Sequence, residues 1–278
     1  MLISSIGGNG LAPAMAASAA GVEPAGEGVI RVRVMTLNIH HGEGLDGRVD
    51  LARLAELIRH WQPDLVGLQE VDRNWGARSN FQDQAAWLAA ELGMQYAFAP
   101  ALRRPSLLGA EAGFGNALLS RYPLLESRVV TLPRQGTRED RSLLIAQVKL
   151  PGQVVQVGVT HLGLSREERL GHVRIILDEL KRANLPTVLM GDWNDRPDSP
   201  EVVAVTLHLQ DVVAAIGQSE AREQATFRYD SPDGRPNVRI DYIFVSGDFQ
   251  VEAVQTVETG VSDHLPVVAD LVWPRKRR

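Results

Sequence analysis

Apolar and polar residues recur with two different periods along the chain. Residues 31–37, RVRVMTL, form a run rich in β-branched side chains, and residues 65–70, LVGLQE, form a shorter apolar run, so both predict strands. Between them, residues 51–61 carry apolar side chains at helical spacing, and Asp50 stands where an N-cap residue is expected. This order of strand, loop, helix and strand indicates an α/β unit at the start of the folded region.

The rest of the chain adds two helices and many strands. Helices are predicted over residues 81–93, where Gly93 marks the end, and over residues 165–183, where Ser165 and Glu168 fit a capping box. Apolar runs bounded by Pro, Gly and charged residues predict strands over residues 115–124, 126–133, 141–150, 153–162, 185–191, 239–246 and 265–273. The first four of these runs have the pattern of consecutive antiparallel strands. So much β structure fits mixed sheets with helices outside better than a Rossmann sheet.

Polar residues that can bind a metal or transfer a proton lie at, within or beside the predicted strands. They are Asn38, Glu70, His161, Asp192, Asn194, Asp241, Asp263 and His264. Most have a structural explanation when taken singly, because amides and aspartates cap turns and histidines can lie in a core. Glu70 is harder to explain, since a carboxylate that ends a buried strand needs a cation or hydrogen-bond donors. Asn38 and Glu70 are both expected at carboxyl ends of strands, where α/β sheets bind ligands.

These residue types together indicate metal-assisted hydrolysis of a phosphate ester. Oxygen ligands of the Glu70 and Asp263 kind suit Mg²⁺ or Mn²⁺, whereas the absence of cysteine and of an HExxH helix disfavours zinc. Histidines can donate hydrogen bonds to a phosphoryl group, and an aspartate with a neighbouring asparagine can orient and deprotonate water. Neither a GxSxG nucleophile motif nor a GxxxxGK[ST] loop is present in the sequence.

Composition indicates the number of domains, the termini and the absence of a transmembrane segment, but does not change the predicted chemistry. The chain has 278 residues, 44% of them hydrophobic and 23% charged, which is typical of a soluble domain with a sizeable core. We predict one folded domain over residues 29–274 and a solvated basic tail over residues 275–278. Residues 1–28 are rich in Ala and Gly and contain no Lys or Arg, so we expect a disordered leader or a degenerate export signal. The absence of a long apolar run predicts no transmembrane segment, and we expect a cytoplasmic protein unless the leader is a truncated signal peptide.

Seven segments, in their order along the chain, resemble motifs of the endonuclease/exonuclease/phosphatase superfamily. They are LNIHHGEG, LVGLQEVDR, FGNALLSRYPL, THLGLS, LMGDWNDRP, RIDYIFVS and SDHLPVVADL, and the resemblance covers about residues 31–273. The superfamily includes DNase I-like nucleases, neutral sphingomyelinases and inositol-phosphate phosphatases. The resemblance implies an α/β fold, a four-layer sandwich in which two mostly antiparallel mixed sheets pack face to face with helices outside.

The resemblance also implies roles for the polar residues. Glu70 would be the main metal ligand, with Asn38 and Asp263 completing the metal side. Asp192 would position or deprotonate the attacking water, and Asn194 would orient Asp192 and a phosphate oxygen. The two histidines would bind the phosphate. His161 would donate to the phosphoryl oxygens, and His264, held by Asp241, would contact the scissile phosphate.

One position departs from part of the superfamily. Abasic-site nucleases of the exonuclease III type carry a carboxylate two residues after the asparagine, where this chain has His40. The segment LNIHHGEG and the phrase QEVDR look more like the bacterial metal-dependent hydrolase branch. Further phosphate contacts are predicted at Arg73, Asn116 and Arg141, because arginine binds phosphate in a forked geometry; for the two arginines a structural ion pair is the alternative.

The substrate expected from the sequence is a small or lipid phosphodiester. A net charge of −5 and an aromatic content of 5% argue against an extended nucleic-acid groove. Residues 103–115, which contain Arg103 and Arg104, are expected to form an irregular loop on the substrate side. Two alternatives remain open at this stage: a nuclease that acts on DNA or RNA, and a catalytically silent module that binds a phosphorylated ligand or a protein. The sequence does not determine the oligomeric state.

Overall fold

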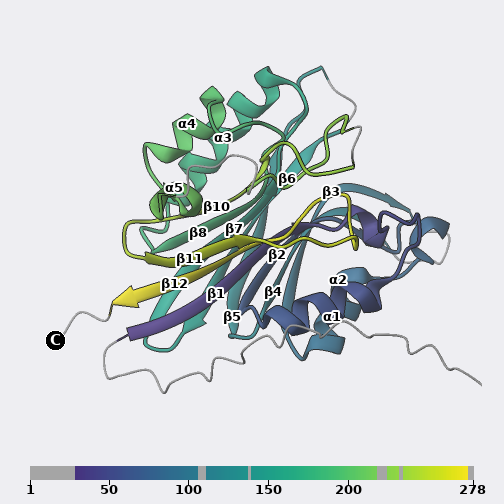
Figure 1. Ribbon diagram of the computed structural model, residues 1–278, viewed down its shortest axis with the longest axis horizontal. Helices are drawn as coiled ribbons and strands as arrows, with labels where there is room; N and C mark the ends of the chain where they lie inside the picture. The colour runs from purple at the N-terminus through teal and green to yellow at the C-terminus, as the bar shows by residue number, and fades with distance from the viewer. Residues whose placement is uncertain (1–28, 106–110, 137–138, 218–223, 232–233, 275–278) are drawn as a thin grey trace, which may run out of the picture.

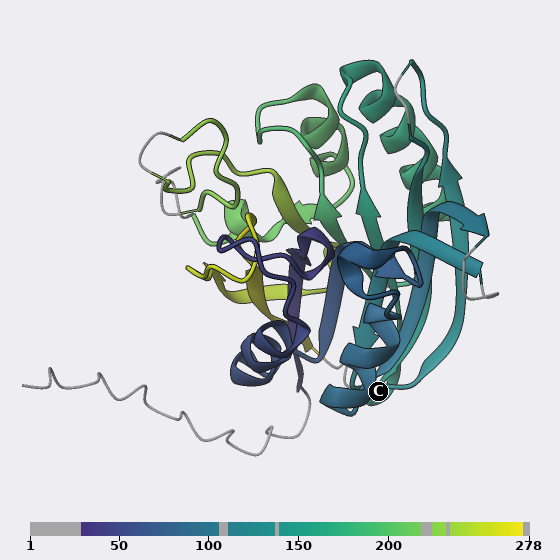
Figure 2. The ribbon, with the colours of Figure 1, turned by 90° about the vertical axis from the view of Figure 1, so that its right-hand side faces the viewer.

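Two six-stranded sheets pack face to face in the computed structural model, which describes residues 29–105, 111–136, 139–217, 224–231 and 234–274 (Figures 1 and 2). The first sheet has the strand order β11 (Gln250–Thr256), β12 (Val267–Pro274), β1 (Val29–Asn38), β2 (Leu65–Arg73), β4 (Glu111–Ser120) and β3 (Gln95–Pro105). The second has the order β5 (Leu124–Leu132), β6 (Arg141–Leu150), β7 (Gln153–His161), β8 (Thr187–Asp192), β10 (Asp241–Val245) and β9 (Gln210–Asp211).

Each sheet is mixed, with one parallel pair at its centre. That pair is β1–β2 in the first sheet and β7–β8 in the second, and the neighbouring strands pair antiparallel. Parallel neighbours need a crossover, and here α1 (Leu51–Trp61) and α3 (Arg166–Lys181) provide it. The predicted sandwich of two mostly antiparallel mixed sheets is therefore confirmed.

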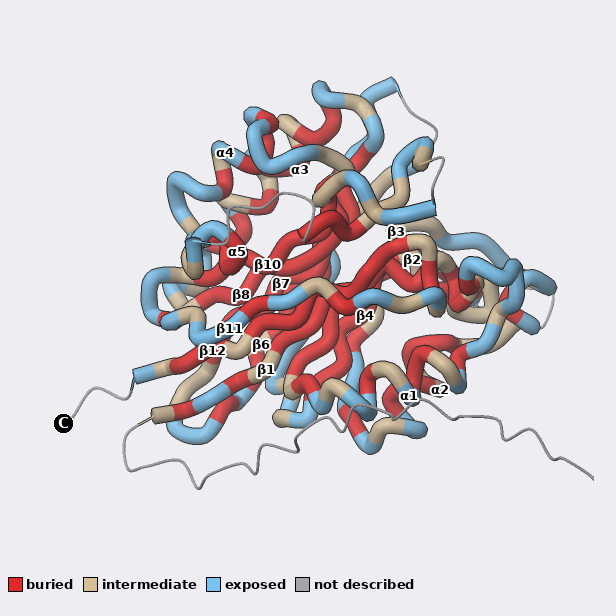
Figure 3. Tube along the Cα trace, viewed as in Figure 1, coloured by how far each residue is buried: buried red, intermediate tan, exposed pale blue. Residues whose placement is uncertain are grey.

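Three apolar clusters fill the spaces between the layers. One lies between the sheets and contains Val32 and Val34 of β1, whereas Met35 and Leu37 of the same strand face the outer cluster beneath α1 and α2 (Gln84–Leu92). The third cluster lies beneath α3 and α4 (Pro200–Thr206) on the second sheet. Every residue of β1 from Val34 to Asn38 is buried, whereas Arg31 is exposed. The middle of the sandwich is mostly red in Figure 3. Three smaller helices are η1 (His40–Gly42), η2 (Ala77–Ser79) and α5 (Val212–Ala215).

Most predicted helix ends agree with the structure, but α2 begins at Gln84 rather than at residue 81. Asp50 accepts hydrogen bonds from the backbone N–H groups of Ala52 and Arg53 at the start of α1, and Ser165 accepts one from Glu168 at the start of α3. The Glu168 carboxylate accepts from the backbone of Gln135. Gly93 ends α2 with a φ of 64°, in the left-handed region that favours glycine.

The strand predictions fail for β9 and β11, which were not predicted, and in the region of β3 and β4. Strands β5, β6 and β7 are consecutive and antiparallel, as expected, but β4 lies in the other sheet between β2 and β3. Strand β3 was not predicted, and the described parts of the segment 103–115 are strand rather than irregular loop, because Arg103 pairs with Gly113 in the β3–β4 ladder. Residues 106–110 of the predicted loop lie outside the described residues, as do the predicted leader and basic tail. No described helix combines the length and apolar composition needed to cross a membrane.

The backbone of β8 approaches β7 so closely at Gly191 that a side chain does not fit. Gly191 has a φ of 150°, and a Cβ there would lie 1.9 Å from the carbonyl oxygen of Thr160. We expect Gly191→Ala to destabilise the fold by about 2 kcal/mol or more, because backbone cannot yield as a flexible side chain can. Thermal or urea unfolding measures this. Gly247→Ala, with nothing within 4 Å of its Cβ, is the control, and equal stability of the two variants would contradict the prediction.

Candidate active site

The predicted site residues gather where the central strands of both sheets end. In the second sheet Asp192, the last residue of β8, pairs with His161 at the end of β7 and with Asp241 at the start of β10. The first sheet supplies Asn38 at the end of β1, and the segment before β12 supplies His264. The parallel pairs bring carboxyl ends to one edge, so topology alone collects these side chains.

Glu70 lies in a β-bulge rather than at the end of its strand. Strand β2 continues to Arg73, and its pairing with β4 shifts register between Leu68 and Val71. Glu70 adopts a φ of 57°, a conformation rare for residues other than glycine. The bulge turns the carboxylate towards Asn38, which explains how a residue inside a strand reaches the site.

The side-chain amide of Asn38 connects the two sheets. Its Nδ2 donates to Oε1 of Glu70 and to Oδ2 of Asp192, each at 3.1 Å, while its Oδ1 accepts from the backbone N–H of His40. Asn38 is 1% exposed. One amide thus fixes the separation of the two carboxylates that the sequence assigns to metal binding and to water activation.

Asp192 is buried among groups that both favour and oppose its charge. Its Oδ1 accepts from the backbone N–H of Asn194 at 2.9 Å, and its Oδ2 lies 3.5 Å from Nε2 of His161 and 3.7 Å from Nε2 of His264. Burial raises the pKa of the Asp192 carboxyl to about 7, and the nearby charge of Asp241 acts in the same direction. A carboxyl with such a pKa is suited to exchange protons near neutrality.

The imidazole of His264 is held as a cation. Its Nδ1 lies 2.9 Å from Oδ2 of Asp241, and its ring packs against Phe227 with centroids 4.5 Å apart. Burial alone lowers the pKa of His264, but the carboxylates of Asp241 and Asp192 outweigh it and raise the pKa to about 10. His264 therefore carries a proton at neutral pH and can donate it to a bound anion through Nε2.

His161 has the opposite electrostatic character. Burial lowers its pKa well below the ordinary value, and the positive charges of Arg141 and His264 add to this effect. Its Nε2 lies 3.0 Å from Nδ2 of Asn194, and its Nδ1 lies 3.5 Å from Nη1 of Arg141. A neutral imidazole beside a charged one gives the site two hydrogen-bonding groups with different protonation at the same pH.

The surroundings of the Glu70 carboxylate fit a binding site for a divalent cation. Among the residues that the structure describes, Glu70 accepts one hydrogen bond, from Asn38, and forms no ion pair. A partly buried carboxylate with so few partners has oxygen lone pairs available for a metal. Asp263, which accepts from the hydroxyl of Ser262, lies near Nδ1 of His40, and Ser262 also donates to the backbone oxygen of Asn38.

The three predicted phosphate contacts differ in their surroundings. Arg141 and Asn116 border a small cavity of about 10 Å³ that Glu70 and His161 also line, and this volume suffices for one water molecule. Asn116 donates to the backbone oxygen and the hydroxyl of Ser142, and its own amide oxygen has no hydrogen-bond partner among the residues that the structure describes. Arg73 instead lies over the ring of Phe98, 4.7 Å from its centroid. A phosphate contact at Arg73 stays a prediction.

Several residues of the site were missed in the sequence. Thr226 accepts from the backbone N–H groups of Ile240 and Asp241, and Phe227 covers His264. Both lie in a segment with no periodic pattern, so only their proximity in the fold identifies them. His40 was noticed as a departure from the nucleases, but its neighbour His41, which lies close to Glu70, was not considered.

Asp192→Asn is expected to stabilise the metal-free protein as pH rises. Asp192 binds its proton more tightly in the folded protein than in the unfolded chain. Ionisation of Asp192 therefore lowers the free energy of unfolding, by an amount that grows from about pH 3.8 to about pH 7 and is constant above that. The amide cannot ionise and avoids this cost. Melting in EDTA should give a gain in Tm over wild type that is larger at about pH 8 than at about pH 5, by on the order of 2–4 °C per kcal/mol removed. A gain independent of pH would contradict the assignment.

Known proteins resemble this chain in both sequence and fold. A model of the endonuclease/exonuclease/phosphatase family matches residues 35–264. The crystal structure of an endonuclease/exonuclease/phosphatase from Beutenbergia cavernae DSM 12333 has 32% sequence identity and a TM-score of 0.71, covering 88% of this chain and 72% of that one. A comparison with curated proteins found no match.

Two more distant structures share the fold. The mannosyl-6-phosphatase from Bacteroides thetaiotaomicron VPI-5482 has 20% identity and a TM-score of 0.66, covering 86% of this chain and 99% of that one. The catalytic domain of human Nocturnin has 22% identity and a TM-score of 0.64, covering 87% and 96%. With a family model that spans most of the sequence, a related structure at 32% identity and the shared sandwich, the chain belongs to the endonuclease/exonuclease/phosphatase family.

Proposed function

We propose that the protein is a divalent-metal-dependent phosphodiesterase that hydrolyses a small or lipid phosphodiester by in-line attack of water. The observation that carries this proposal is the buried pair of Asp192 and His264. A carboxyl with a pKa of about 7 and an imidazolium lie 3.7 Å apart, and Asn38 links the carboxyl to Glu70. A base, a cationic donor and a metal ligand thus lie side by side in one cluster of polar groups.

The residues divide the chemistry between them. Ionised Asp192 accepts a proton from the attacking water, and the Asn194 N–H and the Asn38 amide keep its two oxygens oriented. His264, held by Asp241 and Phe227, donates to a phosphoryl oxygen as negative charge develops there. A divalent cation bound by Glu70, with Asn38 and Asp263, would neutralise charge on the phosphate.

Charge alone does not separate a diester from a monoester at this site. The carboxylates of Glu70, Asp192, Asp241 and Asp263 are offset by Arg141, by protonated His264 and by a bound divalent cation. The preference for a diester is the expectation from the sequence. The mannosyl-6-phosphatase with the same fold is a phosphatase by its name, so monoester hydrolysis is the alternative that must be measured.

Hydrolysis of bis-p-nitrophenyl phosphate and of p-nitrophenyl phosphate tests the proposal directly. Diester cleavage should require Mg²⁺ or Mn²⁺ and stop in EDTA. His264→Ala and Asp192→Asn should each lower kcat by about 10²–10⁴-fold, the usual contribution of a general acid or base. His60→Ala is the matched control, because His60 is exposed at the end of α1.

Other outcomes separate the alternatives. Cleavage of the monoester alone would make the protein a phosphatase. Efficient nicking of plasmid DNA at physiological salt, lost in Asp192→Asn, would make it a nuclease. Failure to hydrolyse a broad panel of both ester types, with metal binding intact, would favour a phospho-ligand or protein-binding module.

The pH dependence of diester hydrolysis provides an independent check. The base must be ionised, so kcat/KM should rise with pH and level off at or below about pH 7. The levelling-off can lie below pH 7 because a bound cation lowers the pKa of Asp192 from its metal-free value. The donor must stay protonated, so kcat/KM should fall above about pH 10. A rate that decreases between about pH 5 and about pH 7 would contradict these two assignments.

A further inference from the structure

The arginine at position 78 is held in place by a buried carboxylate. Its Nε donates to Oδ2 of Asp72 at 2.8 Å, and its Nη2 donates to Oδ1 at 2.7 Å. Asp72 is fully buried and also accepts from the hydroxyl of Ser79 at 2.7 Å, whereas the Arg78 side chain is 42% exposed. A forked pair of this kind fixes the plane and the direction of the guanidinium.

The pair leaves one edge of the guanidinium open. Asp72 occupies the edge formed by Nε and Nη2, so the edge formed by Nη1 and the second N–H of Nη2 is free. Within the part of the chain that the structure describes, Asp72 is the one hydrogen-bond partner of Arg78. An exposed edge with two parallel N–H donors is the geometry in which arginine binds two oxygens of a phosphate.

Arg78 lies next to the candidate active site. Its Cζ is 5.3 Å from the centroid of the Phe114 ring, and Phe114 borders the small cavity beside Glu70. The hydrogen bonds to Asp72 and the charge of that residue raise the pKa of Arg78 above its ordinary value, and the negative charges of Glu70 and Glu139 act in the same direction. The guanidinium is therefore within electrostatic reach of the proposed metal ligand.

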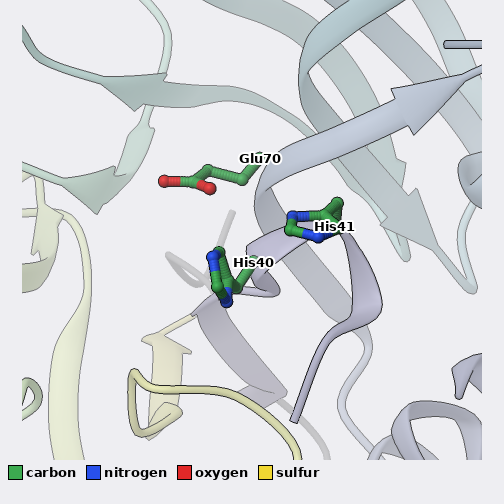
Figure 4. A group of neighbouring side chains, drawn as sticks. All are labelled: His40, His41 and Glu70. Carbon is green, nitrogen blue, oxygen red and sulfur yellow. The ribbon is translucent and has the colours of Figure 1, made fainter. Parts of the chain in front are cut away.

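A buried glutamine fixes this pair relative to the metal side of the site. Oε1 of Gln84 accepts from the backbone N–H of Asp72 at 2.9 Å, and its Nε2 donates to the backbone oxygen of His41 at 2.7 Å. His41 belongs to η1, and its ring lies beside the Glu70 side chain (Figure 4). Gln84 is fully buried, so water does not compete for these hydrogen bonds, and they hold Arg78 at a set place beside Glu70.

We propose that Arg78 is a further substrate-binding residue, and that the open edge of its guanidinium binds anionic oxygens of the phosphate ester on the side of Phe114. The inference deepens the proposed function and rests on it for the identity of the ligand. Asp72 balances the charge of Arg78, so the contribution of Arg78 is directional: its oriented N–H donors, rather than net charge, select the oxygens of a phosphate.

Two neighbouring arginines are less suited to this contact. Arg73 lies over the ring of Phe98, and Arg104 lies over the ring of Trp75 and donates to the backbone oxygen of that residue. Neither donates to a carboxylate among the residues that the structure describes, so neither guanidinium is oriented by a fork. Arg78 combines a fixed orientation with an exposed edge.

The alternative role of Arg78 is to compensate the buried charge of Asp72. Compensation requires only the edge formed by Nε and Nη2, and a residue that does no more than this affects folding alone. Removal of the guanidinium would then lower the Tm and leave the phosphate affinity of the folded protein unchanged. Phosphate affinity therefore separates the two roles.

Calorimetric titration with inorganic phosphate in the presence of Mg²⁺ measures the contact without turnover. Arg78→Gln should weaken phosphate binding by about tenfold or more, the loss expected for a hydrogen bond between charged groups, and leave the affinity for Mg²⁺ nearly unchanged. Arg78→Lys should lie between Arg78→Gln and wild type, because lysine keeps the charge but not the fork. Arg59→Gln is the matched control, since Arg59 pairs with Glu91 on the exposed surface of α1.

Hydrolysis of bis-p-nitrophenyl phosphate gives a second readout. KM should rise in Arg78→Gln by a factor similar to the loss of phosphate affinity, while kcat changes less, because the contact is made in the ground state as well as in the transition state. Thermal melts show whether each variant is folded. If Arg78→Gln does not fold, Arg78→Lys decides: weaker phosphate binding supports the inference, and unchanged binding overturns it.

Three results would overturn the inference. They are unchanged phosphate affinity in folded Arg78→Gln, an equal loss of Mg²⁺ and phosphate binding, which would assign Arg78 a structural role at Glu70, and no phosphate binding by the wild type. The proposed function can fail separately. Phosphate binding that depends on Arg78, in a protein that hydrolyses neither p-nitrophenyl ester, would support the inference and refute the proposed function.

Discussion

The geometry of the site depends on the hydrogen bonds that the side-chain amide of Asn38 donates. Its two N–H groups are shared between Glu70 of the first sheet and Asp192 of the second, so one planar group sets the distance between two carboxylates. Without such a donor the two negative charges would repel each other in a poorly solvated space.

The two histidines of the candidate site illustrate how the surroundings decide the chemistry of one residue type. His161 has an arginine at 3.5 Å and is neutral, whereas His264 has an aspartate at 2.9 Å and is charged. Both are buried, so burial cannot explain the difference. The charged neighbour of each ring explains the difference in protonation, because β10 brings Asp241 next to His264 and β6 brings Arg141 next to His161.

Local chemistry explains which elements could be predicted from the sequence. Asp50 and Ser165 cap helices through bonds to residues two or three positions away, so the signal and its effect lie in one short segment. The placement of β4 in the first sheet depends on its partners β2 and β3, which no local pattern specifies. Strand β3 was missed because Pro100 and Pro105 interrupt its apolar run.

The same distinction applies to the site. Residues at strand ends, such as Asn38 and Asp192, could be selected because an isolated polar residue after an apolar run is conspicuous. The bulge at Glu70 could not be foreseen, since it requires a register shift against β4. Neither could the role of Phe227, because a loop residue gains a function only through the ring it covers.

The pairing of β1 with β12 has a consequence for how the domain is made. Residues 29–36 form their ladder with residues 267–274, so the first strand has no antiparallel partner until almost the whole domain has left the ribosome. Contacts of such long sequence separation slow folding, because the entropy of closing the chain is lost before the contacts form. His264 lies three residues before the start of that last strand. Completion of the fold and assembly of the candidate site are therefore a single late event in the life of each new chain.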